Sequence, residues 1–314
     1  MTFSQDVKSE IVLQQLKACD QRAQLSALLS LCGSYIISSN RPQLLLVSEN
    51  SQVIKQARIL VFGLYKAQSQ ITVVRKMKLK KNNQYQLRIT SEVERILAEC
   101  GLWGANGLRA VPLASLLKKE CCQRAYIAGA FLAGGSVNSP HTSNYHLEIA
   151  ANSEALAGFI QKQLIAHDLP ARTITRRGQF VVYLKASEKI SDFLRWLNLS
   201  GCVMTFEDER IKRDFYNNLN RLDNFEVANN LKAMSTGLRQ VADIELIQKY
   251  LPLVKPEKKL LEVMELRLDF PEHSLKELCL EYLRRYHHTI SKSGMKHRLA
   301  KISNLALEVQ KRIQ

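Results

Sequence analysis

Basic side chains dominate the carboxyl-terminal segment of the chain, at a density that suits contact with nucleic acid. Between Arg284 and Arg312 the sequence has eight Lys or Arg residues and a single acid, Glu308. Lys and Arg donate hydrogen bonds to phosphate oxygens and to guanine O6 and N7, while Ser and His also reach base edges. A solvated helix face, the alternative interpretation, would carry both signs of charge. The segment therefore favours DNA recognition.

The apolar residues of this segment indicate which of its side chains face outward. We expect a helix over residues 291–309 with Ser291 as its N-cap. Met295, Leu299 and Ile302 lie within about 60° of one another on the helical wheel and should face a core. The opposite face is polar and basic, with Arg298 on its flank. The candidate DNA-binding residues of the segment are Arg284, Arg285, Ser291, Lys292, Ser293, Lys296, His297, Arg298 and Lys301.

Two further helical patterns precede this one. The first covers residues 257–270, and the second opens with a capping box, in which Ser274 is the N-cap and Glu277 follows three residues later. The residues expected to face the core are Leu260, Val263, Met264 and Leu268 of the first helix and Leu275, Leu278, Tyr282 and Leu283 of the second. Three helices with a short turn before a basic last one predict a helix-turn-helix domain over residues 255–314.

A second group of cations lies in the first half of the chain, where two strand patterns predict a hairpin. No acid occurs between Ile71 and Ser91, and the basic residues there are Arg75, Lys76, Lys78, Lys80, Lys81 and Arg88. A later hairpin pattern carries Arg172, Arg176, Arg177 and Lys185. The candidate phosphate-binding residues are Lys78, Lys80, Lys81, Arg176 and Arg177. A solvated basic hairpin is the alternative.

The two hairpins occupy equivalent places in an internal repeat. When the sequence is shifted by 102 positions, Gly33 falls on Gly135, and no gap is needed across about 45 residues. Residues 20–102 and 122–199 form the two copies, and each predicts the order α-β-β-α-β-β-α. The helices are expected at 21–34, 51–65 and 91–100 in the first copy and at 123–136, 153–167 and 187–198 in the second. Two such units should pair about a pseudo-twofold axis.

The first helix of each copy carries small residues on one face. In the first copy these are Ala23 and Ala27, which are four residues apart. In the second copy Ala125, Gly129 and Ala133 follow one another at the same interval. Side chains this small let two helices cross almost backbone to backbone. A buried helix that is merely rich in Ala and Gly is the alternative. We expect the two helices to form the interface between the copies.

The sequence IAGAFLAGG at residues 127–135 resembles the LAGLIDADG helix of homing endonucleases, and residues 25–33 resemble it more weakly. The resemblance implies that the two helices form the interface and that the basic hairpins belong to a saddle lying on DNA. In that family the eighth position of each motif supplies an acid that binds the catalytic metal. Here these positions are Cys32 and Gly134, which cannot hold cations as carboxylates do. The nearest acid, Glu148, has no counterpart, so we expect a nuclease scaffold without catalysis.

Over essentially its whole length the chain resembles the WhiA family of bacterial DNA-binding regulators. The resemblance rests on the acid-free LAGLIDADG-like pair, on NRLDNFEVANNLKAM at 220–234 and on SLKEL and SKSGMKHRLAKI near the end. It implies an α+β fold: a duplicated LAGLIDADG-like domain over 1–204, a connector over 205–254, and an all-α helix-turn-helix domain like sigma-factor region 4 over 255–314. The link at 279–290 looks longer than the family's, which could lengthen the second helix by a turn or open the turn.

The connector is dense in both signs of charge and in asparagine. We expect it to be solvated and partly helical, and to lead into a helix from about 236 to 249. Pro252 and Pro256 then end the segment. A DNA-facing linker that uses Lys212, Arg213 and Arg221 is the alternative.

The whole chain carries 45 Lys and Arg against 29 Asp and Glu, a net charge of +16. This excess indicates a polyanionic partner, and nucleic acid is favoured over an acidic membrane surface. The uncharged stretches 23–40 and 125–147 have apolar cores of about 13 residues, too short for the roughly 20 that a bilayer requires. Seven cysteines without a C-x-x-C pair, and no signal peptide, predict reduced thiols and a cytoplasmic, nucleoid-associated protein.

No other chemistry is indicated by the sequence. His141, His146 and the pair His287-His288 lack further ligands at tetrahedral spacing, so no metal or cofactor is expected. The family resemblance implies a transcriptional regulator in cell division, chromosome segregation or sporulation. We expect a monomer that binds double-stranded DNA, with a transcription partner protein or RNA polymerase as a candidate protein partner. An active endonuclease, and a role in RNA binding or protein docking, are the alternatives.

Overall fold

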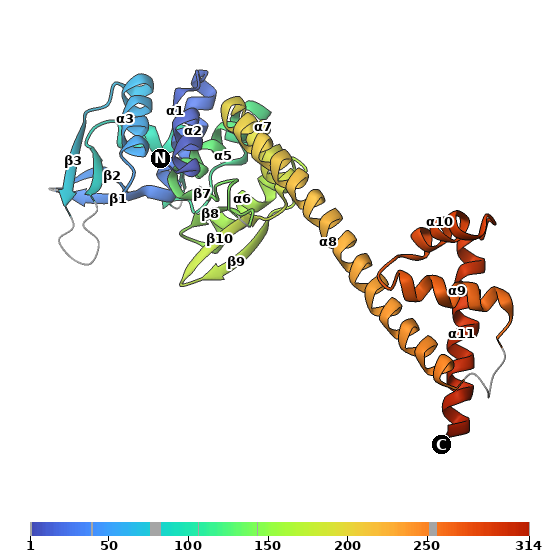
Figure 1. Cartoon of the computed structure of the whole chain (residues 1–314). Coiled ribbons are helices and arrows are strands. Elements are labelled where there is room, and N and C mark those ends of the chain that lie inside the picture. The colour runs from blue at the N-terminus through green and yellow to red at the C-terminus, as the bar shows by residue number, and fades with distance from the viewer. Residues whose placement is uncertain are drawn as a thin grey trace. The chain divides into compact units, whose positions relative to one another are not determined.

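The computed structural model describes residues 2–38, 40–75, 83–105, 107–142, 144–250 and 256–313. The chain divides into two units, Met1–Arg213 and Asp214–Gln314. The division falls inside one continuous helix, α8 (Ser200–Lys249), shown in yellow to orange in Figure 1. In the described part of the chain, no helix combines the length and the apolarity that crossing a bilayer needs.

One continuous helix, α8, covers the residues for which the sequence predicts a partly helical connector followed by a separate helix. Ion pairs three residues apart support its early turns, since Arg210 lies 2.8 Å from Glu207 and Lys212 lies 2.8 Å from Glu209. The asparagines between 217 and 230 are all exposed, in agreement with the expected solvation of this segment. Because these side chains stay in water, they do not interrupt the helix.

Unit 1 contains the predicted repeat, with the predicted order of elements in both copies. A short helix, α1 (Phe3–Leu13), precedes it. The first copy consists of α2 (Ala18–Cys32), β1 (Gly33–Ser38), β2 (Arg41–Ser48), α3 (Ser51–Tyr65), β3 (Ser69–Arg75), β4 (Asn83–Ile89) and α4 (Val93–Glu99). The second consists of α5 (Glu120–Gly134), β7 (Gly135–Val137), β8 (Leu147–Ala151), α6 (Glu154–Ile165), β9 (Arg172–Arg176), β10 (Gln179–Leu184) and α7 (Ser187–Trp196). Between the copies lie β5 (Trp103–Gly104), β6 (Gly107–Leu108) and a 3-10 turn at Ala114–Leu117.

Each copy folds into one antiparallel four-stranded sheet. The strand orders are β1-β2-β4-β3 and β7-β8-β10-β9, so the two sheets have the same topology. Equivalent apolar pairs cross the middle of each sheet, with Leu46 opposite Leu87 in one and Ile149 opposite Val182 in the other. All four side chains are buried. At the end of β4, Leu87 and Ile89 are buried and Arg88 between them is exposed, which agrees with the period of two in its sequence.

The first helix of each copy ends earlier than the sequence predicts. Both α2 and α5 pass directly into a strand, at Gly33 and at Gly135. The chain turns so tightly here that a Cβ on Gly135 would overlap the ring of Phe131. A glycine permits this close approach, and the expected helix ends at residues 34 and 136 are therefore each wrong by two positions.

Helices α2 and α5 cross through their small residues, as predicted. A Cβ on Gly129 would lie 2.6 Å from the carbonyl oxygen of Gln24 and 2.9 Å from the Cβ of Ala27. Ala23, Ala27 and Ala125 are buried beside this crossing. The backbones meet because no larger side chain separates them, and the two copies share one continuous hydrophobic core.

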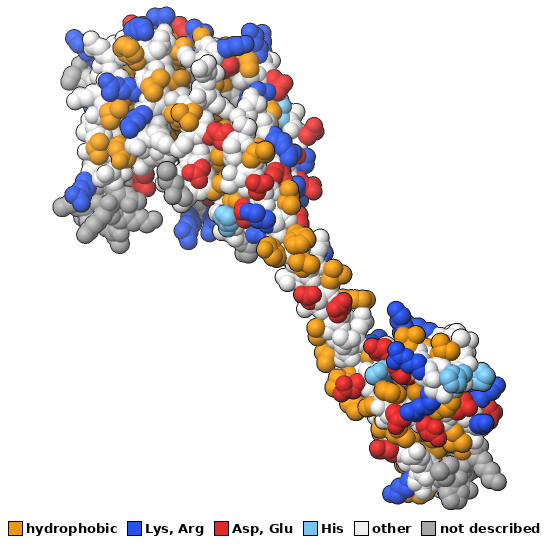
Figure 2. Space-filling view, turned by 45° about the horizontal axis from the view of Figure 1, so that its top comes forward, with side chains coloured by type: hydrophobic (Ala, Val, Ile, Leu, Met, Phe, Trp, Pro, Cys, Tyr) orange, Lys and Arg blue, Asp and Glu red, His pale blue; other side chains and the backbone are white. Residues whose placement is uncertain are grey.

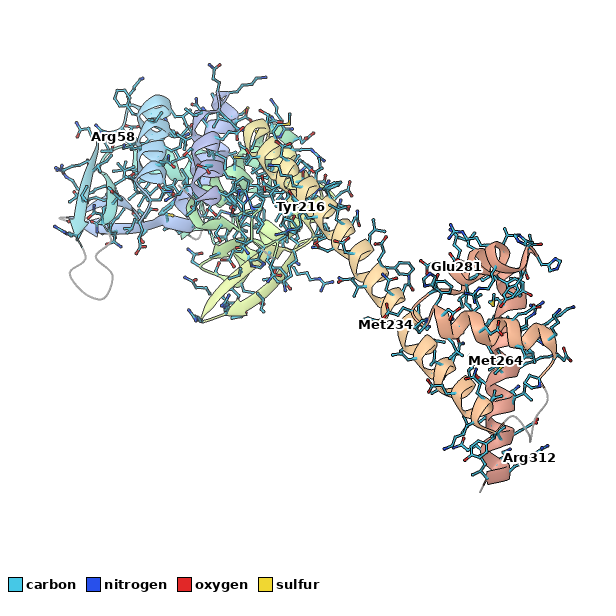
Figure 3. The ribbon with its side chains drawn as sticks, in the orientation of Figure 1. Arg58, Tyr216, Met234, Met264, Glu281 and Arg312 are labelled. Atoms are coloured by element: carbon cyan, nitrogen blue, oxygen red, sulfur yellow. The ribbon has the colours of Figure 1, made fainter. Side chains whose placement is uncertain are left out.

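Unit 2 consists of the second part of α8 with α9 (Lys258–Asp269), α10 (Leu275–Tyr286) and α11 (Lys292–Ile313). Met264 lies among these helices (Figure 3). The core residues are Ile244, Ile247, Leu260, Val263, Met264, Leu266, Leu278, Tyr282, Met295, Leu299, Ile302 and Ala306. Leu268 and Leu275 pack against them, but Leu283 is 41% exposed, so its assignment to the core is wrong. The long link before α11 extends α10 to Tyr286, and His287 ends it in the left-handed region with φ of 56°.

A buried arginine shapes the turn between α9 and α10. Arg267 is only 2% exposed, and its guanidinium donates to the carbonyl oxygens of Phe270, Pro271 and His273 at 3.2, 3.3 and 2.8 Å. A Cβ on Gly237 of α8 would overlap the carbonyl oxygen of Pro271. The turn therefore packs directly on α8.

Candidate nucleic-acid interface

The amino-terminal half of α11 exposes the face that the sequence predicts. Met295, Leu299 and Ile302 are buried, whereas Lys292, Ser293, Lys296, His297 and Lys301 are exposed. Ser291 is the predicted cap, because its Oγ accepts from the backbone N–H of Gly294 at 3.1 Å. Lys292, Ser293, Lys296, His297 and Lys301 thus form an exposed polar row on a helix whose other face is anchored, and we call it the α11 face.

Arg298 lies on the flank of this helix, as predicted, but its guanidinium is engaged within unit 2. Its Nη1 donates to the hydroxyl oxygen of Tyr282 at 2.9 Å, and the guanidinium carbon lies 5.3 Å from the Tyr282 ring centroid. The Tyr282 hydroxyl in turn donates to Glu262 of α9 at 2.6 Å. Arg298 therefore connects α11 to α10 and α9, so a contact with DNA would require it to leave these partners.

Arg284 and Arg285, at the end of α10, each have an acidic partner. Arg284 lies 2.6 Å from Glu281, and Arg285 lies 2.6 Å from Asp269. Both arginines remain exposed. The contact with Asp269 raises the pKa of Arg285 above its ordinary value. Exposed pairs of this kind contribute about 0–1 kcal/mol, so a phosphate could replace the carboxylate at little cost.

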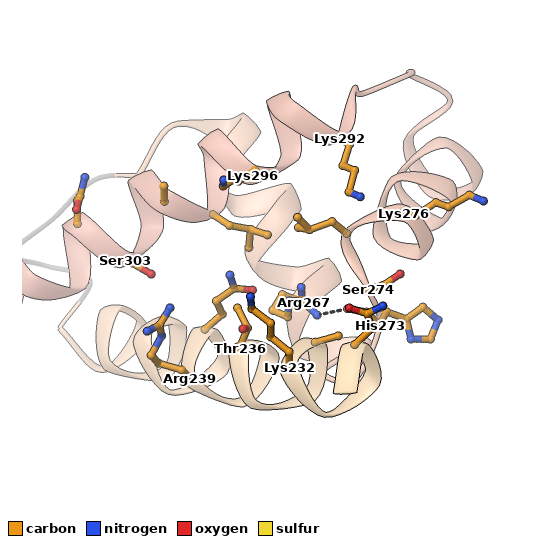
Figure 4. Close-up of a pocket in the computed structure, with 17 residues that line it drawn as sticks. Lys232, Thr236, Arg239, Arg267, His273, Ser274, Lys276, Lys292, Lys296 and Ser303 are labelled. Atoms are coloured by element: carbon orange, nitrogen blue, oxygen red, sulfur yellow. Dashed lines mark hydrogen bonds between the residues drawn. The ribbon is translucent and has the colours of Figure 1, made fainter. Parts of the chain in front are cut away.

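A pocket of about 800 Å³ extends the basic surface of unit 2 beyond the α11 face (Figure 4). Its cationic lining comes from four helices: Lys232 and Arg239 of α8, the buried Arg267 of α9, Lys276 of α10, and Lys292 and Lys296 of α11. None of the described residues that line it is acidic. In Figure 4, Lys292 and Lys296 descend from one side and Lys232 and Arg239 lie on the other. Such a concave positive surface favours an anionic ligand.

Lys232, Arg239 and Lys276 were not among the candidates predicted from the sequence. One signal could have found two of them: Lys232 and Arg239 are seven residues apart, which places them on one face of a helix. The linker residues considered instead, Lys212, Arg213 and Arg221, do not line this pocket. Only the packing of α8 against α10 and α11 joins its cations to the predicted ones.

In unit 1 the candidate phosphate-binding residues divide into two groups. Arg176 and Arg177 lie at the β9–β10 turn, where Arg177 and Gly178 have φ of 52° and 76°, and both arginines are exposed. Lys78, Lys80 and Lys81 lie outside the described residues. The strands that flank them expose Arg75 and Arg88, and Arg88 donates to Gln43 at 3.1 Å. The turn of the second hairpin thus presents two adjacent arginines to solvent.

The positions that hold metal-binding acids in homing endonucleases carry no acid here. A Cβ on Gly134 would lie 2.5 Å from the carbonyl oxygen of Ala150, so even alanine has no room there. Cys32 is half-buried, and burial raises the pKa of its thiol to about 11. Glu148, the nearest acid, accepts from Ser136 at 3.1 Å and lies 3.2 Å from His146. These helix ends therefore offer no pair of carboxylates for divalent cations.

The histidines singled out in the sequence do not meet one another. His141 lies 3.0 Å from Glu209 of α8, within unit 1, and His146 pairs with Glu148. His287 and His288 are exposed at the end of α10. They flank the α11 face, where they can contact phosphate or solvent.

The fold and the exposed basic surfaces define a class of protein: a duplicated LAGLIDADG-like scaffold that continues into a helix-turn-helix domain. Three family descriptions match successive parts of the chain. They are the WhiA N-terminal LAGLIDADG-like domain at residues 18–103, the WhiA LAGLIDADG-like domain at 123–216 and the WhiA C-terminal HTH domain at 219–306. The chain belongs to the WhiA family.

Similar proteins match this chain from end to end. The probable cell division protein WhiA of Oceanobacillus iheyensis is 39% identical over 313 residues, covering 99% of this chain and 98% of that protein. The probable cell division protein WhiA of Enterococcus faecalis is 37% identical over 312 residues and covers 99% of both. The crystal structure of full-length WhiA from Thermotoga maritima has a TM-score of 0.58 at 21% identity and covers 98% of this chain and 99% of its own. This last likeness shows the fold.

Proposed function

We propose that this chain is a sequence-specific DNA-binding transcriptional regulator that acts in cell division, chromosome segregation or sporulation. The observation that carries the proposal is the α11 face. Its exposed Lys, Ser and His side chains stand on a helix anchored by Met295, Leu299 and Ile302. A fixed helix with polar residues near its amino terminus suits the major groove of DNA. The naming of relatives as probable cell division proteins supports the cellular role.

The α11 face reads bases in this proposal, and the surrounding cations bind phosphates. Arg284, Arg285 and the pocket residues Lys232, Arg239 and Lys276 supply charge without sequence information. Arg176 and Arg177, together with Lys78, Lys80 and Lys81, supply further phosphate contacts from unit 1. The protein acts on double-stranded DNA as a monomer, in the cytoplasm at the nucleoid.

The scaffold of unit 1 serves binding and not hydrolysis in this proposal. The crowding at Gly134 and the thiol at Cys32 support it, because neither position supplies the carboxylate that a divalent cation requires.

Docking of a protein is the second candidate function, and one observation favours it. The part of α8 that belongs to unit 2 exposes large apolar side chains, visible in orange in Figure 2. They include Phe215, Tyr216, Leu222, Phe225 and Leu231, and Tyr216 projects from the helix in Figure 3. These side chains are distributed around the helix, and a transcription partner protein or RNA polymerase that bound α8 would bury some of them.

Chromatin immunoprecipitation with sequencing tests the proposed function. The native chain should enrich a limited set of promoters that share one sequence element, and a purified chain should protect that element from cleavage in a footprint. Enrichment without a shared element, together with no protection of any enriched fragment, would contradict sequence-specific binding and favour recruitment through a protein partner.

A further inference from the structure

The amino-terminal turns of α2 and α5 bring together four side chains, three cysteines and one aspartate, of types that commonly bind metal ions in proteins. They are Cys19 and Asp20 at the start of α2, and Cys121 and Cys122 at the start of α5. One ligand atom from each lies within 4.8 Å of every other. We call this group the Cys₃Asp cluster. It lies at the opposite ends of these helices from Cys32 and Gly134.

The cluster follows from the internal repeat and from the crossing of the two helices. The shift of 102 residues places Cys19 on Cys121 and Asp20 on Cys122, so each copy contributes the same two positions. Both helices begin within one residue of the first ligand, and the contact at Gly129 holds them close together. Two ligands from each copy therefore meet where the first helices of the two copies come together.

The separations suit a tetrahedral zinc ion. Zinc binds thiolate sulfur at about 2.3 Å, so four ligand atoms around it lie roughly 3.8 Å apart. The Cys19 Sγ and the Asp20 Oδ1 are already 3.5 Å apart, and the whole set lies within 4.8 Å. Small rotations of four side chains would close it on an ion. Three sulfurs and one carboxylate oxygen are all donors that zinc accepts, whereas calcium and magnesium prefer oxygen alone.

The burial of Asp20 is a second, independent observation. This carboxylate is only 8% exposed and forms no ion pair with any described residue of the chain. Its neighbours are thiols, and a buried carboxylate without a counter-charge is costly. A divalent cation is the counter-charge that would let these groups ionise side by side.

Access and charge around the cluster are compatible with a bound ion. A pocket of about 500 Å³ reaches Cys19 and Cys122, and its charged lining consists of Lys118, Lys119 and the ion pair of Arg22 with Glu99. Zinc with three thiolates and one carboxylate carries a net charge of −2. The two lysines and the positive ends of two helices would offset that charge.

We propose that Cys19, Asp20, Cys121 and Cys122 form a structural zinc site that ties the amino-terminal turns of α2 and α5 together. Four protein ligands leave no open position, so the ion stabilises the junction of the two copies and takes no part in hydrolysis. The site lies wholly in unit 1 and does not depend on the proposed reading of DNA by α11.

The test measures metal content and coordination in the full-length chain, purified under reducing conditions. Elemental analysis by inductively coupled plasma mass spectrometry should give about one zinc ion per chain. After removal of zinc, titration with Co²⁺ should produce thiolate charge-transfer bands and the intense visible bands of tetrahedral cobalt, which an excess of Zn²⁺ abolishes. A chain that contains no zinc and gives only the weak spectrum of octahedral cobalt would overturn the proposal.

Single variants separate the cluster from the other thiols. Cys121→Ser should lose the bound zinc and most of the charge-transfer intensity, and Asp20→Asn, which keeps the size of the side chain, should weaken cobalt binding at least tenfold. Cys32→Ser, at the other end of α2, is the matched control and should retain one zinc. Equal metal binding by Cys121→Ser and Cys32→Ser would contradict the site.

A measurement on the native chain covers the case in which the variants do not fold. Titration with a mercurial reagent should release zinc to a coloured chelator in proportion to the thiols modified. Zn²⁺ should also raise the melting temperature of unit 1, and a chelator should lower it. A native chain that holds a disulfide between Cys19 and Cys121 or Cys122 in place of zinc would overturn the proposal.

Discussion

The guanidinium of Arg298 lies over the ring of Tyr282, with its carbon 5.3 Å from the ring centroid, and donates a hydrogen bond to the Tyr282 hydroxyl at 2.9 Å. Because Tyr282 also donates to Glu262 at 2.6 Å, one phenol connects three helices of unit 2. The orientation of α11, and with it the direction of the α11 face, depends on this connection. Tyr286, one turn after Tyr282 on α10, likewise donates a hydrogen bond from its hydroxyl to Glu265 of α9 at 3.1 Å.

Removal of the Tyr282 hydroxyl should destabilise unit 2. In Tyr282→Phe both hydrogen bonds are lost while the ring remains, so we expect a loss of about 1–2 kcal/mol in the free energy of unfolding. Thermal and urea unfolding followed by circular dichroism measures it. Tyr216→Phe is the control, because that ring is exposed on α8, and it should change stability little. Equal stability of the two variants would show that the connection contributes nothing.

Sequence preference should depend on Lys296 and His297. Replacing both by Ala should abolish preference for the native site, since each base contact contributes about 1–3 kcal/mol of discrimination, while folding and weak nonspecific binding remain. The control is the double variant Lys258→Ala and Lys259→Ala, which removes two exposed lysines from α9 without touching α11. Footprints on the native site compare them. The same protection by the Lys296 and His297 variant would refute the assignment.

Leu299→Ala should behave differently from these surface changes. Leu299 is buried in the core of unit 2, and the loss of such a side chain costs about 2–5 kcal/mol. We therefore expect a lower melting temperature together with weaker binding to every duplex. A normal melt with a selective loss of site preference would mean that this residue does not anchor the helix.

The hairpins of unit 1 should contribute to affinity through phosphates alone. Arg176→Gln with Arg177→Asn, where Asn tolerates the left-handed backbone, should weaken binding to all duplexes alike. Each lost contact should flatten the plot of log affinity against log salt by about one unit. Neutralising Lys78, Lys80 and Lys81 should act in the same way. An unchanged salt slope in both variants would show that these residues are solvated and do not contact phosphates.

The chain should not cleave DNA. With supercoiled plasmid and Mg²⁺ or Mn²⁺ we expect no nicked or linear product above background, because Cys32 and Gly134 stand where acids would be needed. Gly134→Asp should lower stability without creating activity, since a Cβ there meets the Ala150 carbonyl oxygen at 2.5 Å. Cleavage that survives repurification and disappears with a chelator would show that the scaffold is active.

The sequence by itself determined the order of elements within the two repeat copies and the buried face of α11. The 102-residue repeat, the capping box at Ser274 and Glu277, and the buried Met295, Leu299 and Ile302 were all predictable. These features arise from local hydrogen bonding and from the periodicity of apolar residues, which depend on neighbours in the chain. The helix ends at Gly33 and Gly135 were missed because a strand begins there without a break.

The tertiary structure alone decided which distant side chains meet. The sequence predicts Arg298 as a DNA-binding residue, but packing of α10 against α11 places its guanidinium over the ring of Tyr282. Lys232, Arg239 and Lys276 join the basic surface only because α8 packs beside α10 and α11. The Cys₃Asp cluster has no metal-binding spacing in sequence, since its two halves lie about a hundred residues apart and meet where α2 crosses α5. Contacts of this kind depend on the packing of whole helices, and the periodicity of a single helix carries no information about its neighbour.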